Sequence, residues 1–300
     1  MGLADVKLSE TPKTSPFSVA IAVFTIFSFE IGAAFTKGLF PSLGAFGAAT
    51  VRLFFGAVIL WVFWRPWRGT LNSAQRWKLL AYGASLGGMS LFFYLALATL
   101  PLGLTLSLEM TGPLTLSLVM SRRLLDIVWI AVAATGLILL LPLGQAMVLD
   151  PRGMVFAVLA GTCWALYIVA GQKAGASLPQ GRAMALSLAV AALVVAPWGV
   201  AKAGAALIDP RNLPVAILSG LFSTAIPYSL DLYAMSRIPA RLFGLLMSLA
   251  PVVGALVGLV MLHEVLSPRQ WTAILFIVAA TGGSSLAEGM RPLPAADAAE

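Results

Sequence analysis

The sequence has few of the residues on which metalloproteins, disulfide-rich proteins and most enzymes depend. Among its 300 residues there is one cysteine, Cys163, and one histidine, His263. A single cysteine excludes an internal disulfide, and a single histidine leaves no His/Cys metal cluster and little scope for histidine-based catalysis. The sequence also lacks a nucleotide-binding glycine loop and a His-Glu-x-x-His motif. We therefore expect no cofactor, no metal and no enzymatic activity.

Charged residues are also scarce, because they make up 10% of the chain against 60% hydrophobic residues, and the mean hydropathy is +0.94. Ordinary globular domains contain about 25% charged residues. So few charges cannot solvate a surface of this size, which predicts an integral membrane protein in contact with the lipid bilayer. The formal charge of +7 would suit a nucleic acid, but lysines and arginines scattered through linkers are typical topology signals. We expect no nucleic-acid partner.

A membrane-spanning helix needs about 20 predominantly apolar residues, and the sequence contains ten such segments. We therefore expect an all-α integral membrane protein of ten transmembrane helices, with tails at 1–16 and 288–300. The ten segments are 17–36, 44–64, 77–97, 101–121, 126–143, 152–173, 182–202, 214–236, 239–262 and 268–286.

The linkers carry unequal charge on the two sides of the predicted membrane. The side that holds the N-terminus carries thirteen lysines and arginines, and the other side carries five. Because these residues are enriched in cytoplasmic loops, both termini should be cytoplasmic. The first sixteen residues lack the cationic start and small-residue cleavage site of a signal peptide, so we expect the first helix to be retained.

The chain repeats one pattern in its two halves. Residues 100–113 and 238–251 each begin with an apolar residue and a proline, and each ends on a second proline twelve positions later. The segments 131–136 and 277–282 also match, as Ala-Val-Ala-Ala-Thr-Gly and Ile-Val-Ala-Ala-Thr-Gly. Each half holds five helices, an odd number, so the second half must be inserted upside down.

The sequence therefore predicts two inverted five-helix repeats around a central cavity, and such repeats place a substrate site near the bilayer midplane. The predicted bounds of the repeats are 17–143 and 152–287.

The second prolines of the repeated pattern, Pro113 and Pro251, fall about midway along the fourth and ninth helices. Each removes a backbone donor and frees the carbonyl four residues earlier, which belongs to Glu109 or Met247. In lipid, such groups are tolerated only where they face protein or a wet cavity. We expect both helices to be kinked, with the prolines as hinges during alternating access.

The second half resembles a known family. Ser248–Gly258 runs on to Leu262–Glu264, Gln270-Trp271 and Gly282-Gly283, and it looks like the second-half signature of EamA-type transporters in the drug/metabolite transporter superfamily. The linker 121–126 departs from the pattern, because it lacks the Leu-x-Glu element. The resemblance covers essentially the whole membrane region.

Among these relatives, the chain is most similar to bacterial exporters of aromatic and other neutral amino acids. The resemblance implies a secondary transporter of the bacterial inner membrane that exports small amphipathic metabolites by alternating access. The alternatives are a carrier of drugs or other metabolites, and a passive channel or lipid-handling protein of the same architecture.

Three ionisable residues lie inside the predicted spans at a similar depth: Glu30, Arg52 and Glu109. Charges within the membrane are costly and mark functional sites by default. In one interpretation, Arg52 neutralises one carboxylate and ties the helices together. In the other, one acid stays unpaired and holds a coupling proton or contacts a substrate ammonium group. We expect Glu264, at the outer mouth, to cap or latch the turn between helices 9 and 10.

We expect the substrate to contact aromatic, apolar and polar side chains near the centre of the bundle. An apolar cavity with a few polar groups suits an amphipathic molecule, although packing alone also explains any single aromatic residue. The candidate substrate-binding residues are Tyr82, Glu109, Met110, Trp164, Tyr228, Met247 and Ser248.

Overall fold

The computed structural model describes residues 16–68, 70–119, 124–140, 150–175, 177–235 and 246–289, and all regular secondary structure in these ranges is helical. Each of the ten predicted segments contains a helix, and most of the two predicted tails lies outside the described residues. The observed helical elements, in chain order, are α1 (Pro16–Gly38), α2 (Phe40–Trp64), α3 (Ser73–Leu97), α4 (Leu102–Glu109), α5 (Thr111–Val119), α6 (Leu124–Leu140), α7 (Pro151–Gly175), α8 (Gln180–Ala203), η1 (Gly204–Ile208), α9 (Leu213–Gly220), η2 (Leu221–Ala225), α10 (Ile226–Met235), α12 (Ala250–Met261) and α13 (Pro268–Gly289).

The outside of the bundle is apolar. Six helical stretches in the described ranges are long and apolar enough to cross a membrane. Large apolar side chains such as Phe54, Val62 and Leu193 are exposed on them. Apolar surface on this scale does not occur on soluble monomers, and it matches the low charge of the chain. The protein is a multi-pass membrane protein, as the composition predicts.

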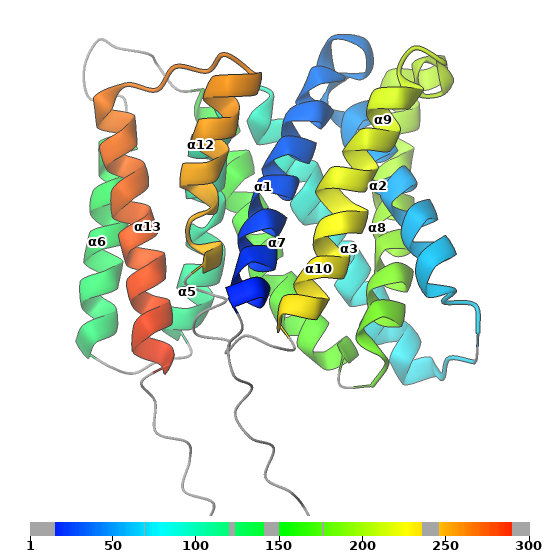
Figure 1. Cartoon of the computed structure of the whole chain (residues 1–300), viewed down its shortest axis with the longest axis horizontal. Coiled ribbons are helices and arrows are strands. Elements are labelled where there is room, and N and C mark those ends of the chain that lie inside the picture. The colour runs from blue at the N-terminus through cyan, green and yellow to red at the C-terminus, as the bar shows by residue number, and fades with distance from the viewer. Residues whose placement is uncertain are drawn as a thin grey trace, which may run out of the picture.

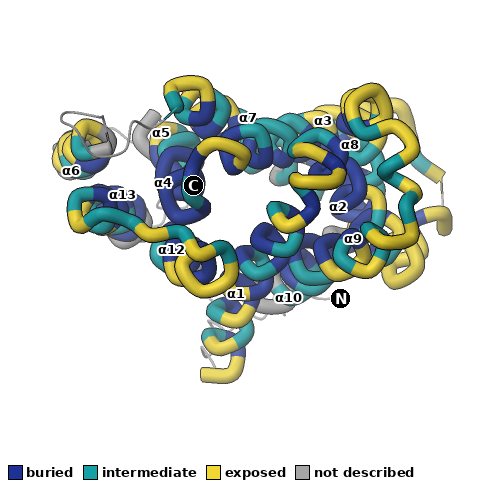
Figure 2. Tube along the Cα trace, turned by 90° about the horizontal axis from the view of Figure 1, so that it is seen from above, coloured by how far each residue is buried: buried dark blue, intermediate teal, exposed yellow. Residues whose placement is uncertain are grey.

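The long helices lie side by side, and the start of α1 and the end of α13 lie at the same edge of the bundle (Figure 1). Viewed from above, α1, α2, α3, α7, α4 and α12 follow one another in a ring, while α6 and α13 form a pair at one end, outside the ring (Figure 2). The buried faces of the ring helices carry the main hydrophobic core, which includes Ile26, Leu53 and Leu86.

Helices from the first part of the chain pack against helices from the second part. The packed pairs are α1 with α10 and α12, α2 with α8 and α9, α3 with α7 and α8, α4 with α7 and α12, and α6 with α13. Lys37 at the end of α1 and Gly153 near the start of α7 both lie close to Leu100. Therefore α1 ends at the edge where α7 begins, and the two helices cross the bundle in opposite directions.

The fourth predicted helix is broken rather than only kinked. Helix α4 ends at Glu109, Met110 forms a turn, and α5 begins at Thr111, so that Pro113 lies in the first turn of a new helix. In that position the missing N–H of proline costs little, because the first N–H groups of a helix have no intrahelical partner. The break falls three residues before the proline that signals it.

The ninth predicted helix is interrupted in the same way. Ser248 and Leu249 form a turn, and α12 begins at Ala250 with Pro251 in its first turn. The N–H of Val253 donates to the carbonyl of Leu249 at 3.0 Å, which closes the first turn of α12. The two repeated prolines therefore occupy equivalent places, each just after an interruption.

The eighth predicted helix contains a feature that the sequence did not indicate. Between α9 and α10, residues Leu221–Ala225 form a π-helical turn, η2. Such a bulge displaces the regular ladder of i→i−4 hydrogen bonds and is frequent at functional sites. Carbonyl groups in this turn are therefore available to side chains from other helices.

Candidate functional site

The π-helical turn η2 is held by polar side chains from the first part of the chain. The Ser28 hydroxyl on α1 donates to the Phe222 carbonyl at 2.7 Å. Arg52 Nη2 on α2 donates to the Ser223 carbonyl at 2.8 Å. Helix α1 approaches this closely because it presents Gly32, where a Cβ atom would overlap the backbone of Ser223. The bulge is thus a docking point for α1 and α2.

Arg52 lies at the centre of this polar region. Its side chain is 6% exposed, and its Nε donates to the Ser223 hydroxyl at 2.6 Å, while Nη1 donates to the Ser90 hydroxyl at 2.8 Å. The guanidinium carbon lies 5.5 Å from the centre of the Tyr94 ring, within the range of a cation–π interaction. Two helices besides its own, α3 and the η2 segment, therefore fix the orientation of the guanidinium group.

Glu30 on α1 and Glu109 on α4 are buried in the same region, at 4% and 5% exposed. Glu30 interacts electrostatically with both Glu109 and Arg52, and Glu109 interacts electrostatically with Arg52. The predicted cluster of three charges, from three helices of the ring, is thus brought together. Within the described ranges, neither carboxylate forms an ion pair with Arg52 at 4.0 Å or less.

The surroundings of the two acids differ. The Glu30 carboxylate lies against Gly254 of α12, where an added Cβ would be 3.4 Å from Oε2. Glu109 interacts electrostatically with Cys163 on α7. Its backbone carbonyl, which Pro113 deprives of a partner, lies so close to Gly161 of α7 that a Cβ there would overlap it. The freed carbonyl therefore faces protein, as the chemistry of a lipid environment requires.

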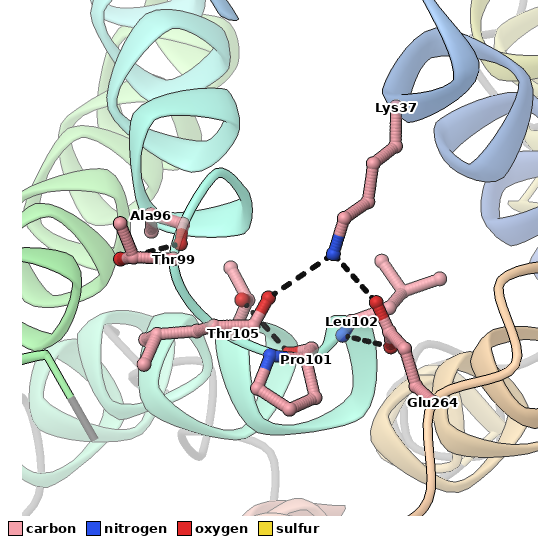
Figure 3. A network of polar contacts seen from close by, with 8 residues as sticks. Lys37, Ala96, Thr99, Pro101, Leu102, Thr105 and Glu264 are labelled. Atoms are coloured by element: carbon pink, nitrogen blue, oxygen red, sulfur yellow. Dashed lines mark hydrogen bonds and ion pairs between the residues drawn. The ribbon is translucent and has the colours of Figure 1, made fainter. Parts of the chain in front are cut away.

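Three elements meet at the edge opposite the start of α1 and the end of α13. Lys37 Nζ lies 2.6 Å from Oε1 of Glu264, and the other carboxylate oxygen accepts the N–H of Leu102 at 2.7 Å (Figure 3). Pro101, at the N-cap position of α4, provides no side-chain cap, so the carboxylate of Glu264 takes that role. Glu264 therefore contacts α1 and α4, whereas the sequence led us to expect a local latch between helices 9 and 10.

The other predicted substrate-binding residues are divided between two hydrophobic clusters. Tyr82 is stacked on Tyr167 with ring centres 4.8 Å apart, and Tyr228 meets Phe29 edge-on at 5.2 Å. Tyr82, Tyr228 and Met247 belong to the main cluster, whereas Met110 and Trp164 belong to the cluster formed with α7, α12 and α13. Ser248 is 1% exposed, in the turn before α12.

Several serines of the candidate site were not indicated by the sequence. Ser223, Ser90 and Ser28 supply the hydroxyl groups around Arg52 and η2, and the hydroxyls of Thr36 and Ser219 share a hydrogen bond. The available signal was the spacing of Ser219 and Ser223, four residues apart in an apolar helix, which places two hydroxyls on one face.

A groove of about 870 Å³ lies between α2 and α8, away from the charge cluster. Its walls are apolar, and they include Phe54, Val58, Leu193 and Val200, which are exposed on the outside of the bundle. A groove of this character faces lipid tails in a membrane. It offers no charged group to a polar substrate, so the cluster around Arg52 is the better candidate site.

In sequence, the chain is similar to known membrane transporters. Residues 151–286 match the model of the EamA-like transporter family. The chain is 44% identical over 270 residues to the threonine/homoserine exporter RhtA of Escherichia coli (strain K12), covering 89% of this chain and 91% of that protein. It is 43% identical over 276 residues to the protein of that name from Salmonella typhimurium (strain SL1344), covering 91% and 93%. A solved crystal structure at 20% identity superimposes with a TM-score of 0.61 and covers 91% of this chain and 98% of the other, which supports the fold alone.

Proposed function

The chain belongs to the EamA-like transporter family, and we propose that it exports threonine, homoserine and chemically similar small neutral amino acids from bacteria. The family consists of membrane transporters, so the protein is not an enzyme. The observation that carries the substrate proposal is the identity with threonine/homoserine exporters, which extends over about nine tenths of the chain. Export of aromatic amino acids, which the sequence resemblance implies, stays a prediction.

We propose that the membrane region consists of two inverted repeats, 17–143 and 152–287. The packing pattern supports this. If α1 corresponds to α7 and α3 to the α9–α10 segment, then the contact of α3 with α7 has its counterpart in the contact of α10 with α1. Likewise, the contact of α4 with α7 has its counterpart in that of α12 with α1. The contacts α4–α12 and α6–α13 each join two corresponding helices, so each contact is its own counterpart.

The proposed mechanism is alternating access, in which the ring opens first to one side of the membrane and then to the other. The interruptions before Pro113 and Pro251 support it, because short helical segments joined by a turn can change their relative angle without breaking a continuous hydrogen-bond ladder. The excess of lysine and arginine on the side of the membrane that holds the termini supports a cytoplasmic location for both termini. The protein would lie in the bacterial inner membrane.

In this proposal, the two buried acids face the amino group of the substrate or a coupling proton. Glu30 and Glu109 both interact electrostatically with one cation, Arg52, so a second carboxyl group is available to accept a proton or the ammonium group of a substrate. Tyr82, Met110, Trp164, Tyr228, Met247 and Ser248 stay as predicted contacts of the substrate.

The test is transport by purified protein in liposomes. Vesicles loaded with unlabelled threonine or homoserine should accumulate the labelled amino acid above its external concentration, because a carrier exchanges substrate across the membrane. A panel that includes serine, valine, phenylalanine and tryptophan defines specificity. Uptake without accumulation would indicate a channel, and accumulation only of aromatic amino acids would replace the proposed substrates.

A further inference from the structure

We propose that Arg52 binds the α-carboxylate of the transported amino acid, so that a free carboxylate is a requirement for transport. This inference rests on the proposed function, because it assigns one end of its substrate. The starting observation is a cation that is 6% exposed in the middle of an apolar bundle. A buried charge of this kind is costly unless an opposite charge compensates it.

The hydrogen bonds of Arg52 are satisfied only in part. A guanidinium group has five N–H donors, and three bonds are formed, to the hydroxyls of Ser223 and Ser90 and to the Ser223 carbonyl. These acceptors are neutral. Among the described residues, this leaves one N–H donor on each terminal nitrogen, and the two oxygens of one carboxylate can accept hydrogen bonds from both terminal nitrogens of an arginine.

The neutral partners also hold the guanidinium group in a fixed orientation. Ser223 belongs to the π-helical turn and receives two of the three bonds, through its hydroxyl and its carbonyl. The Ser223 hydroxyl in turn donates to the Ser219 carbonyl at 2.6 Å. The ring of Tyr94 lies 5.5 Å from the guanidinium carbon. A group oriented in advance loses little freedom when it binds a carboxylate, which favours binding.

The opposite end of the substrate has matching partners. Glu30 and Glu109 have no hydrogen-bond partner within the described ranges, yet both are coupled electrostatically to Arg52. An amino acid at neutral pH carries one carboxylate and one ammonium group. With the carboxylate at Arg52 and the ammonium at the acids, the carboxylate meets a cation and the ammonium can donate to carboxyl oxygens, while the side chain of the substrate is left to determine specificity.

The first experiment uses the wild-type protein in liposomes. Threonine, threoninamide and 1-aminopropan-2-ol are compared as competitors of labelled threonine uptake, because the last two keep the amino and hydroxyl groups but lack the carboxylate. Losing a hydrogen bond to a charged group lowers affinity by roughly 10- to 100-fold, and we expect both analogues to compete more weakly by that factor. Competition as strong as that of threonine would overturn the assignment.

The second experiment uses Arg52→Gln, with Arg65→Gln as the matched control at an exposed residue just after α2. The readout is the ratio of apparent affinities for threonine and threoninamide. We expect Arg52→Gln to lower the threonine affinity by roughly 10- to 100-fold and to leave threoninamide unchanged, so that the ratio approaches one. If Arg52→Gln lowers the affinities for threonine and threoninamide equally, Arg52 only holds helices together.

The outcomes separate this inference from the proposed function. If the wild type transports threonine but accepts threoninamide equally well, the assignment of Arg52 fails and the proposed function stands. If the wild type carries no amino acid of the panel, the proposed function fails and the assignment fails with it. Should Arg52→Gln not fold, the competition experiment on the wild type still decides.

Discussion

The ammonium group of Lys37 lies 2.6 Å from the carboxylate of Glu264, and this ion pair joins the end of α1 to the loop between α12 and α13. The second oxygen of Glu264 binds the N–H of Leu102, at the N-terminus of α4. A negative charge is favourable there, because the N-terminus of a helix carries a partial positive charge. One carboxylate therefore connects α1, α4 and the loop after α12 at the edge opposite the start of α1 and the end of α13.

We expect loss of this connection to favour opening at that edge. In Glu264→Gln the amide oxygen can still accept the N–H of Leu102, but the charge pairing with Lys37 is lost. The native Cys163 should then react faster with a hydrophilic maleimide added from outside. The two side chains are only 24% and 13% exposed, so the pair contributes more than a surface salt bridge, and we expect the free energy of unfolding to fall by roughly 1–3 kcal/mol.

The control for this experiment is Lys202→Met, which removes an exposed positive charge near the end of α8. It should leave the reactivity of Cys163 unchanged. Equal labelling rates in Glu264→Gln and the wild type would show that the ion pair does not restrict opening.

The break between α4 and α5 depends on a close approach of two backbones. A Cβ atom on Gly161 would overlap the Glu109 carbonyl, and one on Gly112 would overlap the Gly161 carbonyl. We therefore expect Gly161→Ala to destabilise the protein by roughly 1–3 kcal/mol, as overpacking does. Thermal unfolding in detergent measures the effect.

The matched control is Gly175→Ala in the same helix, α7, because an added Cβ there meets no atom within 4 Å. A lower melting temperature in Gly161→Ala than in Gly175→Ala is the expected result. If the two variants have the same melting temperature, the contact between α5 and α7 is looser than the backbone positions indicate.

The buried acids should differ in their effect on pH dependence. Glu109 interacts electrostatically with Arg52, Glu30 and Cys163, and it is the last residue of α4, directly before the break. If its protonation accompanies the movement of α4 and α5, Glu109→Gln should flatten the pH profile of transport more than Glu30→Gln does. Uptake measured across a pH series in liposomes tests this. Wild-type profiles in both variants would assign the two acids a structural role.

Much of the fold follows from the sequence because it depends on local signals. Apolar length predicts the helices, and Pro113 and Pro251 predict interruptions of the fourth and ninth. The interruptions lie two or three residues before the prolines, since a proline is tolerated in the first turn of a helix. The prolines alone therefore predict that each helix is interrupted. The residue at which the next helix begins depends on its packing against the other helices of the ring.

The partners of the charged residues could not be predicted in the same way. Leu221–Ala225 contains neither glycine nor proline, so nothing in its composition distinguishes a π-helical turn from an ordinary one. One interpretation of the sequence had Arg52 neutralise an acid. Arg52 does interact electrostatically with Glu30 and Glu109, but its hydrogen bonds go to Ser223 and Ser90, which the sequence did not indicate. Which faces of two distant helices meet depends on packing over the whole bundle, and a single sequence does not reveal it.

The two repeated prolines lead to the last prediction. In Pro113→Leu or Pro251→Leu the backbone regains an N–H, which can bind the carbonyl of Glu109 or Met247 and extend one continuous helix across the interruption. A proline within a helix costs about 3 kcal/mol, but both prolines lie in first turns, so we expect the free energy of unfolding to change by much less. Transport should nevertheless fall, because alternating access requires these helices to bend differently in its two states.

The repeats are inverted in our proposal, so α4 and α12 are related by a reversal of the membrane direction. Straightening one helix should therefore stabilise the state opposite to the one stabilised by straightening the other. Cysteines introduced at Thr99 and Ser177, on opposite edges, should show opposite changes in labelling in the two proline variants, with Cys163 replaced by alanine. Pro197→Leu, which removes an exposed proline from the interior of α8, is the control and should change neither. Wild-type transport and labelling in Pro113→Leu and Pro251→Leu would mean that these prolines only shape static packing.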